Sequence, residues 1–105
     1  MKGFSENVLE LTKKIPKGKV TTYSEIARAL GNPDASRAVG NALKSNACPD
    51  KIPCYRVVHS DGSVGGYSGR GSTKEKVRRL ERDGIEITKG KVDLKRYFHS
   101  LRKKD

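Results

Sequence analysis

The chain has 105 residues, which fits one domain with a modest hydrophobic core. Its 23 Lys and Arg residues against 12 Asp and Glu residues give a net charge of +11, which favours a polyanionic partner, nucleic acid above all. Because no apolar run is long enough for a signal peptide or a membrane span, we expect an intracellular, cytoplasmic protein, associated with the nucleoid through DNA and with no membrane partner.

Few side chains are available for a metal site. Cys48 and Cys54 do not form a CxxC pair, and His59 and His99 are isolated in the sequence. Zinc ligation therefore lacks ligands, and neither a metal nor another cofactor is expected. In a reducing compartment we also expect both thiols to be free rather than joined in a disulfide.

The first predicted element is a helix over residues 4–15, followed by a stop at 16–18 and a short extended connector at 19–21. Ser5 is the expected cap of its first turn. The apolar residues of this helix recur at helical spacing: Phe4, Val8, Leu11 and Ile15.

Two further helices are predicted close together. Thr22 and Glu25 form a capping box that starts the second helix, and Gly31 ends it. Asn32 is the expected N-cap of the third helix, over residues 33–45, with proline at its first position. Its inward residues are expected to be Ala35, Ala38, Val39, Ala42 and Leu43. Two short helices joined by a tight turn predict a helix-turn-helix.

The third predicted helix has small side chains that allow a close approach to a partner. Ala35, Ser36 and Gly40 are small, and Arg37 is the large basic exception. Plain core packing is the alternative interpretation of this helix pair. The basic charge of the chain favours DNA binding, with this helix presented to a groove.

The stretch 51–58 holds the candidate nucleophile. Cys54 directly follows proline, and the β-branched Val57 and Val58 come soon after it. This pattern predicts a buried strand that begins at the cysteine. A thiol at the mouth of a strand, beside Arg56 in a basic chain, is a candidate reactive group, and a small buried core residue is the alternative.

The region after this strand is rich in turn residues. Asp61 and Gly62 form the centre of a predicted hairpin turn. The glycine-rich segment 65–71 that follows is interpreted either as a flexible wing or as backbone that passes close to a ligand.

Two more helices complete the prediction. Ser72 and Glu75 form a capping box for a helix through residue 82, with Val77 and Leu80 facing inward and a glycine closing it at position 84. A docking helix is predicted over 92–104, with one apolar face of Leu94, Tyr97, Phe98 and Leu101. The predicted fold is mostly α with a small β-hairpin, a winged-helix-like helix-turn-helix DNA-binding domain over residues 1–105.

Several motifs occur in an order that resembles a known family. They are IPKGKVTTY at 15–23, GNP at 31–33, RAVG at 37–40, IPCYRVV at 52–58, GGYSG at 65–69 and the helical segment 74–81. Together they resemble the C-terminal, DNA-binding and active-site domain of the O6-alkylguanine-DNA alkyltransferases (methylated-DNA–protein-cysteine methyltransferases). The resemblance covers nearly all of the chain, and we expect the family's N-terminal domain to be absent.

The resemblance implies roles for three residues in particular. Cys54 would accept the alkyl group from O6 of a damaged guanine. Arg37 would enter the base stack and fill the place of the flipped nucleotide. Tyr23 would hydrogen-bond the extruded guanine and help to protonate the leaving base.

The same resemblance implies a pocket around the cysteine. The Ser68 amide would contact O6, and the carbonyls of Cys54 and Val57 would accept from the exocyclic amine. Asn46 would brace the active-site turn, and Glu81 would orient the relay that draws the proton from the thiol. Further pocket or DNA-contacting residues implied in this way are Tyr67, Gly69, Lys74, Thr22, Ala35 and Ser36.

One position departs from the family pattern. The family usually has histidine directly after the cysteine, and this chain has Tyr55. A tyrosine, of pKa about 10, is a poor general base at neutral pH. We expect Tyr55 to hold a water through its hydroxyl, with slower or altered thiol activation rather than loss of transfer.

The expected function is repair of double-stranded DNA that contains O6-alkylguanine, by a monomer that transfers the alkyl group to Cys54 once. A soft thiolate suits this displacement, and the base must be flipped out of the duplex for the thiol to reach it. Two alternatives stay open: an alkyltransferase-like lesion sensor that binds without transfer, and a winged-helix DNA binder with no pocket. The last has no need of the Pro-Cys pair, the glycine-rich loop and Tyr23 together.

Overall fold

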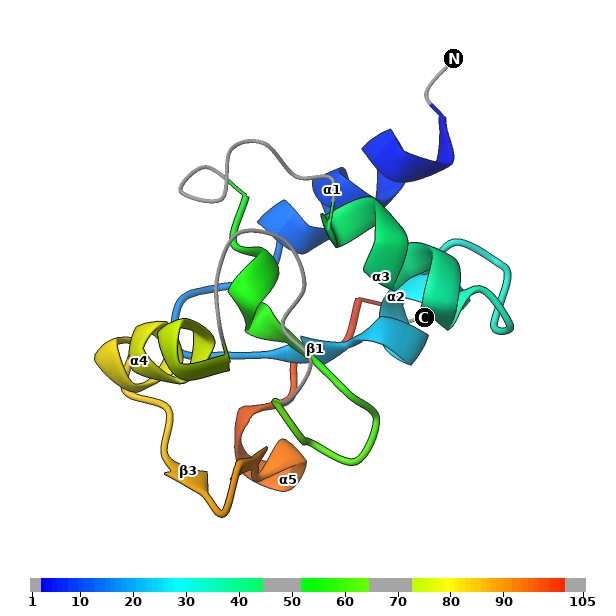
Figure 1. The fold of residues 1–105 in the computed structure, drawn as a ribbon. Coiled ribbons are helices and arrows are strands. Elements are labelled where there is room, and N and C mark those ends of the chain that lie inside the picture. Colours follow the sequence, from blue (N-terminus) through cyan, green and yellow to red (C-terminus); the bar gives the residue numbers. More distant parts are fainter. Residues whose placement is uncertain (1–2, 45–51, 65–72, 102–105) are drawn as a thin grey trace.

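The computed structural model describes residues 3–44, 52–64 and 73–101, and Figure 1 shows their arrangement. The described part is mostly helical, as expected from the sequence, and it has two small sheets where one β-hairpin was expected. None of its helices has the length and apolar character needed to cross a membrane. In chain order its elements are α1 Phe4–Lys13, β1 Thr21–Thr22, α2 Tyr23–Ala29, α3 Ser36–Lys44, η1 Cys54–Arg56, β2 Val57–Val58, α4 Thr73–Arg82, β3 Ile87–Thr88, β4 Lys91–Val92 and α5 Leu94–Tyr97.

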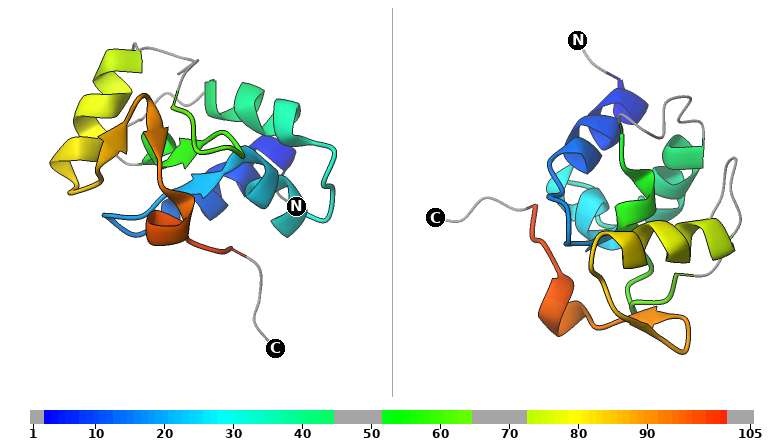
Figure 2. Two further views of the ribbon diagram at one scale, coloured as in Figure 1. Left: turned by 90° about the horizontal axis from the view of Figure 1, so that it is seen from below. Right: turned by 90° about the vertical axis from the view of Figure 1, so that its left-hand side faces the viewer.

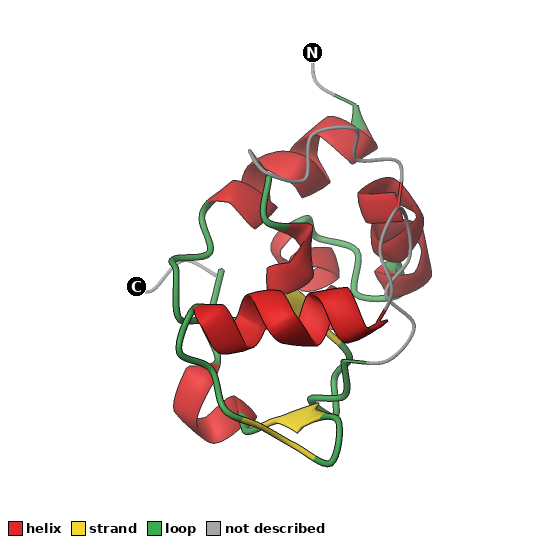
Figure 3. Ribbon diagram, turned by 60° about the vertical axis from the view of Figure 1, so that its left-hand side comes forward, coloured by secondary structure: helices red, strands yellow, loops and turns green. Residues whose placement is uncertain are grey.

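The parallel strand pair β1–β2 lies at the centre of the molecule and separates two hydrophobic cores. Val57 of β2 belongs to a first core with residues of α1, α2 and α3, whereas Val58 belongs to a second core with residues of α4 and the C-terminal elements. Successive side chains of a strand point to opposite faces, so one short strand can supply both cores. Figure 3 shows α4 crossing in front of this central region.

Local capping signals predicted two of the helices well. The Thr22 hydroxyl accepts from the backbone N–H of Glu25 at 3.0 Å and caps α2. At the other end Gly31, with φ of +82°, allows the chain to fold back so that the Asn32 N–H donates to the Ala27 carbonyl at 3.0 Å. Gly84, with φ of +91°, ends α4 in the same way.

The start of α3 and the cap of α1 differ from the prediction. Helix α3 begins at Ser36, three residues late, because the Ala35 N–H donates to the Asn32 carbonyl and closes a turn first. Ala38, expected to face inward, is exposed. Gly3 rather than Ser5 occupies the N-cap position of α1, and no side chain caps that helix.

The β-hairpin lies later in the chain than predicted. The turn at Asp61-Gly62 forms, with the Gly62 N–H donating to the His59 carbonyl at 2.8 Å, but Ser63 then forms an antiparallel bridge with Lys91. The hairpin is β3–β4, whose connecting residues Lys89 and Gly90 both have positive φ, of 52° and 75°. This is the backbone of a type I′ turn, which suits the twist of two paired strands.

The predicted C-terminal helix is wrong beyond its first turn. Helix α5 ends at Tyr97 because the chain becomes extended at Phe98 and pairs in parallel with Val20. The His99 N–H donates to the Val20 carbonyl at 2.7 Å. Figure 2 shows this orange-to-red segment at one edge of the molecule, leading to the C-terminus.

A buried carboxylate holds the segment that follows. Glu25 of α2 is 2% exposed, and its Oε2 accepts from the Ser100 hydroxyl at 3.1 Å and from the Leu101 N–H at 2.9 Å. These hydrogen bonds join residues 75 or more positions apart in sequence, so the capping-box glutamate also anchors the C-terminal segment.

Candidate active site

Cys54 lies at the start of a single 3-10 turn instead of at the start of a strand. Because Pro53 has no N–H and fixes the backbone before the cysteine, the chain turns here, and the Arg56 N–H donates to the Pro53 carbonyl at 2.9 Å. The Val57 N–H then donates to the Cys54 carbonyl, and β2 begins at Val57. Cys54 forms no disulfide and is buried, with 7% of the residue exposed.

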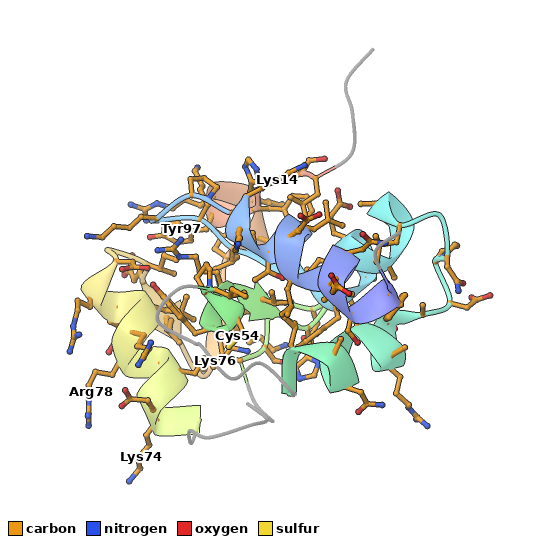
Figure 4. The ribbon with its side chains drawn as sticks, turned by 90° about the horizontal axis from the view of Figure 1, so that it is seen from above. Lys14, Cys54, Lys74, Lys76, Arg78 and Tyr97 are labelled. Atoms are coloured by element: carbon orange, nitrogen blue, oxygen red, sulfur yellow. The ribbon has the colours of Figure 1, made fainter. Side chains whose placement is uncertain are left out.

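A lysine that the sequence analysis passed over lies beside this thiol. Lys76 of α4 is wholly buried, at 0% exposed, and its ammonium donates to the Val57 carbonyl at 2.6 Å. Burial lowers the pKa of Lys76 to about 8, and the nearby Cys54 charge opposes that shift. Figure 4 shows Lys76 on the inner side of α4 near Cys54, whereas Lys74 and Arg78 point outward.

Tyr23 forms a second side of the site. Its ring lies 5.7 Å from the Lys76 ammonium and 5.3 Å from the His59 ring. A Cβ at Gly40 of α3 would lie 3.9 Å from this ring, so a small residue there lets α3 lie close against Tyr23. Burial raises the pKa of Tyr23, and the Cys54 charge raises it further, so the phenol is protonated at neutral pH and has a hydroxyl to donate.

Tyr55 has its hydrogen bonds elsewhere. Its ring belongs to the second core, whereas Cys54 belongs to the first. The Tyr55 hydroxyl donates to Oδ2 of Asp83 at 2.7 Å and accepts from Arg56 at 3.1 Å. Burial is the largest cause of a raised pKa for Tyr55, and the hydrogen bond to Asp83 adds to it. This arrangement ties Tyr55 to Asp83 and gives no support to the expectation that it serves the thiol.

Two charged residues were expected in the pocket from the resemblance, and neither side chain is buried there. Lys74 and Glu81 are both exposed on α4. The buried lysine is Lys76, and the carboxylate bonded to Tyr55 is Asp83. One sequence signal could have indicated this pair: Lys76 lies four residues before the buried Leu80 and Asp83 three residues after it, which is the spacing of one helix face. Because lysines are rarely buried, this spacing alone does not predict a buried Lys76.

The residues expected to contact DNA fall into two groups. Arg37 is exposed and Ser36 half-buried, both in the first turn of α3. The Ala35 side chain packs in the first core, and the Thr22 hydroxyl is buried as the cap of α2. The structure therefore leaves Arg37 and Ser36 available at the surface, whereas the Thr22 and Ala35 side chains are buried. A contact of Thr22 or Ala35 with DNA stays a prediction.

Some expected site residues cannot be compared with the structure. Asn46, Tyr67, Ser68 and Gly69 lie outside the described residues. Within 3–44, 52–64 and 73–101, no three His, Cys, Asp or Glu side chains are grouped so that they could hold a metal ion.

Known proteins resemble this chain over most of its length. Residues 3–85 match the family model described as 6-O-methylguanine DNA methyltransferase, DNA binding domain. A bifunctional methyltransferase/endonuclease of Picrophilus torridus is 54% identical over 87 residues, which are 83% of this chain and 28% of that protein. The chain thus spans less than a third of this relative's length.

Two other relatives match the chain nearly end to end. A DNA base-flipping protein of Vibrio parahaemolyticus is 39% identical over 98 residues, 92% of this chain and 96% of that protein. The structure of Schizosaccharomyces pombe Atl1 in complex with damaged DNA containing O6-carboxymethylguanine superimposes with a TM-score of 0.84 at 33% identity. This superposition covers 95% of the present chain and 99% of Atl1.

Proposed function

Because the chain belongs to the family of the 6-O-methylguanine DNA methyltransferase DNA-binding domain, we propose that it repairs DNA by moving the alkyl group of an O6-alkylguanine to Cys54. The whole activity is a proposal for this chain, since it spans only part of the relative named as a methyltransferase. DNA is the proposed partner on three grounds: the family, the solved complex of Atl1 with damaged DNA, and the net charge of +11.

The observation that carries the proposal is a buried cysteine outside any disulfide, with a buried lysine and a tyrosine around it. Burial at 7% exposure protects the Cys54 thiol from bulk solvent and from bulky reagents. Lys76 supplies a positive charge next to it, and Tyr23 supplies a hydroxyl donor. A thiolate is the nucleophile and a thiol is not, so a neighbouring cation favours the reactive form.

The proposed reaction is a single displacement. After the thiol gives up its proton, the sulfur electron pair attacks the alkyl carbon and forms an S–C bond. The bond from that carbon to O6 breaks, and its electrons pass to the guanine. The guanine then takes one proton, for which the Tyr23 hydroxyl is a suitable donor because its raised pKa keeps it protonated. The thioether is stable, so each molecule acts once.

Arg37 and α3 are the proposed means of reaching a base that is buried in the duplex. An alkylated guanine inside the base stack is inaccessible to a buried thiol, so the nucleotide has to rotate out of the helix. Arg37 is exposed in the first turn of α3, where a cationic side chain can contact phosphates or fill the gap left by the base. We propose in addition that this region folds as a winged-helix-like DNA-binding unit.

A lesion sensor without transfer is the second candidate. It is favoured by the two relatives that match nearly end to end, one named as a DNA base-flipping protein and one solved with damaged DNA. Tyr55 adds to it, because its hydroxyl is bonded to Asp83 and Arg56. Against it stands Cys54, which is not in a disulfide and has a cation beside it.

Intact mass spectrometry separates the two candidates. The protein is mixed with a duplex that contains one O6-methylguanine, with Cys54→Ala as the control. Transfer predicts a stoichiometric gain of one CH2 that is absent from the control. Tight binding to the lesion duplex with no change in mass would refute the transferase proposal and favour the sensor.

A further inference from the structure

Lys76 is a charged side chain in a place where folding alone would favour an apolar one. It lies on α4 where this helix contacts η1, and none of it is exposed. A buried ammonium is strongly unfavourable unless it is paired and hydrogen-bonded. A methionine would fill similar space without that cost. The lysine is therefore best explained by what its charge does.

The contacts described for Lys76 include groups of the candidate site. Its ammonium has three N–H donors, and the Val57 carbonyl accepts one of them at 2.6 Å. Val57 follows η1 directly, so this hydrogen bond fixes the ammonium against the turn that carries Cys54. The Tyr23 ring, 5.7 Å away, closes the other side.

Tyr55 is poorly placed to take over the role of a base for the thiol. Its hydroxyl proton is directed to Asp83, and its oxygen accepts from Arg56. Its ring is packed in the second core, on the other side of the strand from Cys54. With Tyr55 engaged there, another group has to receive the thiol proton.

We propose that Lys76 receives the proton of the Cys54 thiol and then holds the thiolate as its ammonium partner, an inference that rests on the proposed alkyl transfer. In this step the S–H bond breaks, its electron pair stays on sulfur, and the proton binds the lone pair of the Lys76 amine. Thiol and amine become thiolate and ammonium with no change in net charge. The thiolate is then consumed when sulfur bonds to the alkyl carbon.

The charge state of Lys76 suits this step near neutral pH. Burial lowers its pKa to about 8, so at pH 7 about a tenth of the side chain is the neutral amine and the rest is ammonium. Tyr23 from α2 is neutral in this range, since its pKa is raised. His59, whose ring lies 5.3 Å from the Tyr23 ring, is a further titratable group near the site and has to be controlled for.

The charges on the far side of the site are paired among themselves. Arg56 contacts Asp83 at 3.4 Å, and Arg79 contacts Glu75 at 3.3 Å along α4. Among the described residues of α4, Lys76 is the buried cation, and it lies near Cys54.

The test measures the reactivity of Cys54 without DNA. In a Cys48→Ser background, which leaves Cys54 as the one cysteine, the rate of alkylation by iodoacetamide is recorded from pH 5 to 10. Lys76→Met is compared with Lys74→Met, which removes an exposed charge two residues away on the same helix. His59→Gln tests whether the histidine contributes to the profile.

The expected result follows from the loss of a neighbouring cation. An opposite charge shifts a titration by about one unit or more, so Lys76→Met should slow alkylation at pH 7 about tenfold and move the profile upward by about one pH unit. Lys74→Met and His59→Gln should leave it unchanged. An unchanged profile in Lys76→Met, or an equal shift in Tyr55→Phe, would overturn the inference.

Two further measurements keep the test decisive. If Lys76→Met does not fold, the Lys76 ammonium is titrated by NMR in the parent protein and in Cys54→Ala. The midpoint of the Lys76 titration should fall when the Cys54 thiolate is removed. An unchanged midpoint would refute the pairing of the two groups. Methyl transfer from an O6-methylguanine duplex is measured on the same proteins. Absence of transfer in the parent would refute the proposed function, while the alkylation profile would still decide the role of Lys76.

Discussion

Removing the hydroxyl of Tyr55 separates a structural role for this residue from a role in thiol activation. In Tyr55→Phe the Asp83 carboxylate loses its 2.7 Å hydrogen bond while it stays largely buried, with 7% of its side chain exposed. Hydrogen bonds to charged groups contribute about 1.5–3 kcal/mol, and the contact to Arg56 at 3.4 Å remains. We therefore expect the free energy of unfolding to fall by about 2 kcal/mol.

Urea unfolding and thermal melting measure this loss. For a domain of this size a loss of 2 kcal/mol lowers the melting temperature by roughly 10 °C. Tyr97→Phe is the matched control, because Tyr97 is also buried in the second core and its hydroxyl accepts only a backbone N–H, that of Glu86, at 3.1 Å. That neutral hydrogen bond should contribute about 1 kcal/mol.

The rate of methyl transfer should stay nearly unchanged in Tyr55→Phe although the stability falls. If the hydroxyl serves Asp83, the rate of methyl transfer measured well below the melting temperature should change by less than about twofold. A variant of unchanged stability that transfers tenfold more slowly would refute the structural role. It would instead support a Tyr55 relay to the thiol.

Three other outcomes follow from the described contacts. Arg37→Ala should weaken duplex binding and reduce the slope of log affinity against log salt concentration by about 1, as measured by fluorescence anisotropy at several salt concentrations. Its melting temperature should not change. An unchanged slope would contradict a contact between Arg37 and a phosphate. Glu25→Ala should lower the free energy of unfolding by about 3 kcal/mol, because a buried carboxylate that holds the C-terminal segment is lost. Hydrogen exchange at the Leu101 amide should become faster. An unchanged exchange rate would show that Glu25 does not hold this segment. Lys76 has a pKa of about 8 in the folded state and about 10.4 in the unfolded state, so the unfolded state binds more protons between these pH values. The free energy of unfolding, measured by chemical denaturation, should therefore rise from pH 8 to 10 by up to about 3 kcal/mol relative to Lys76→Met. Parallel pH curves for the two proteins would contradict the lowered pKa.

The parts of the fold that sequence reasoning reached are those fixed by neighbours in the chain. Thr22 caps α2 through a hydrogen bond to a residue three positions on, and Gly31 ends that helix through its own positive φ. The predicted start of α3 was wrong because Asn32 and Pro33 suit a turn as well as the start of a helix, and in the structure they form a turn.

The parts that sequence reasoning missed depend on contacts between distant segments. Residues 98–101 have a helical apolar pattern, yet the pairing with Val20 and the anchor at Glu25 draw them into an extended path. The hairpin at Lys89-Gly90 has a local sequence signal, a turn-forming glycine between the β-branched pair Ile87-Thr88 and the β-branched Val92.

The candidate site shows the same division. Cys54 could be identified from the sequence because proline directly precedes it and the Val57-Val58 pair follows soon after. The burial of Lys76 arises only when α4 packs on η1, and its position relative to Cys54 is therefore a tertiary property. Residues two positions apart on a helix point in directions that differ by more than half a turn. The orientation of α4 about its own axis therefore decides whether Lys74 or Lys76, and whether Glu81 or Asp83, faces the interior.

The most direct test of the central claim is to locate the transferred group by peptide mass spectrometry. Protein and an O6-methylguanine duplex are mixed in equal amounts, digested and sequenced by tandem mass spectrometry, for the natural chain and for Tyr55→Phe. The account predicts one S-methyl group on Cys54 in both proteins and none on Cys48. A methyl group elsewhere, or no methyl group on a protein that binds the lesion duplex tightly, would contradict it.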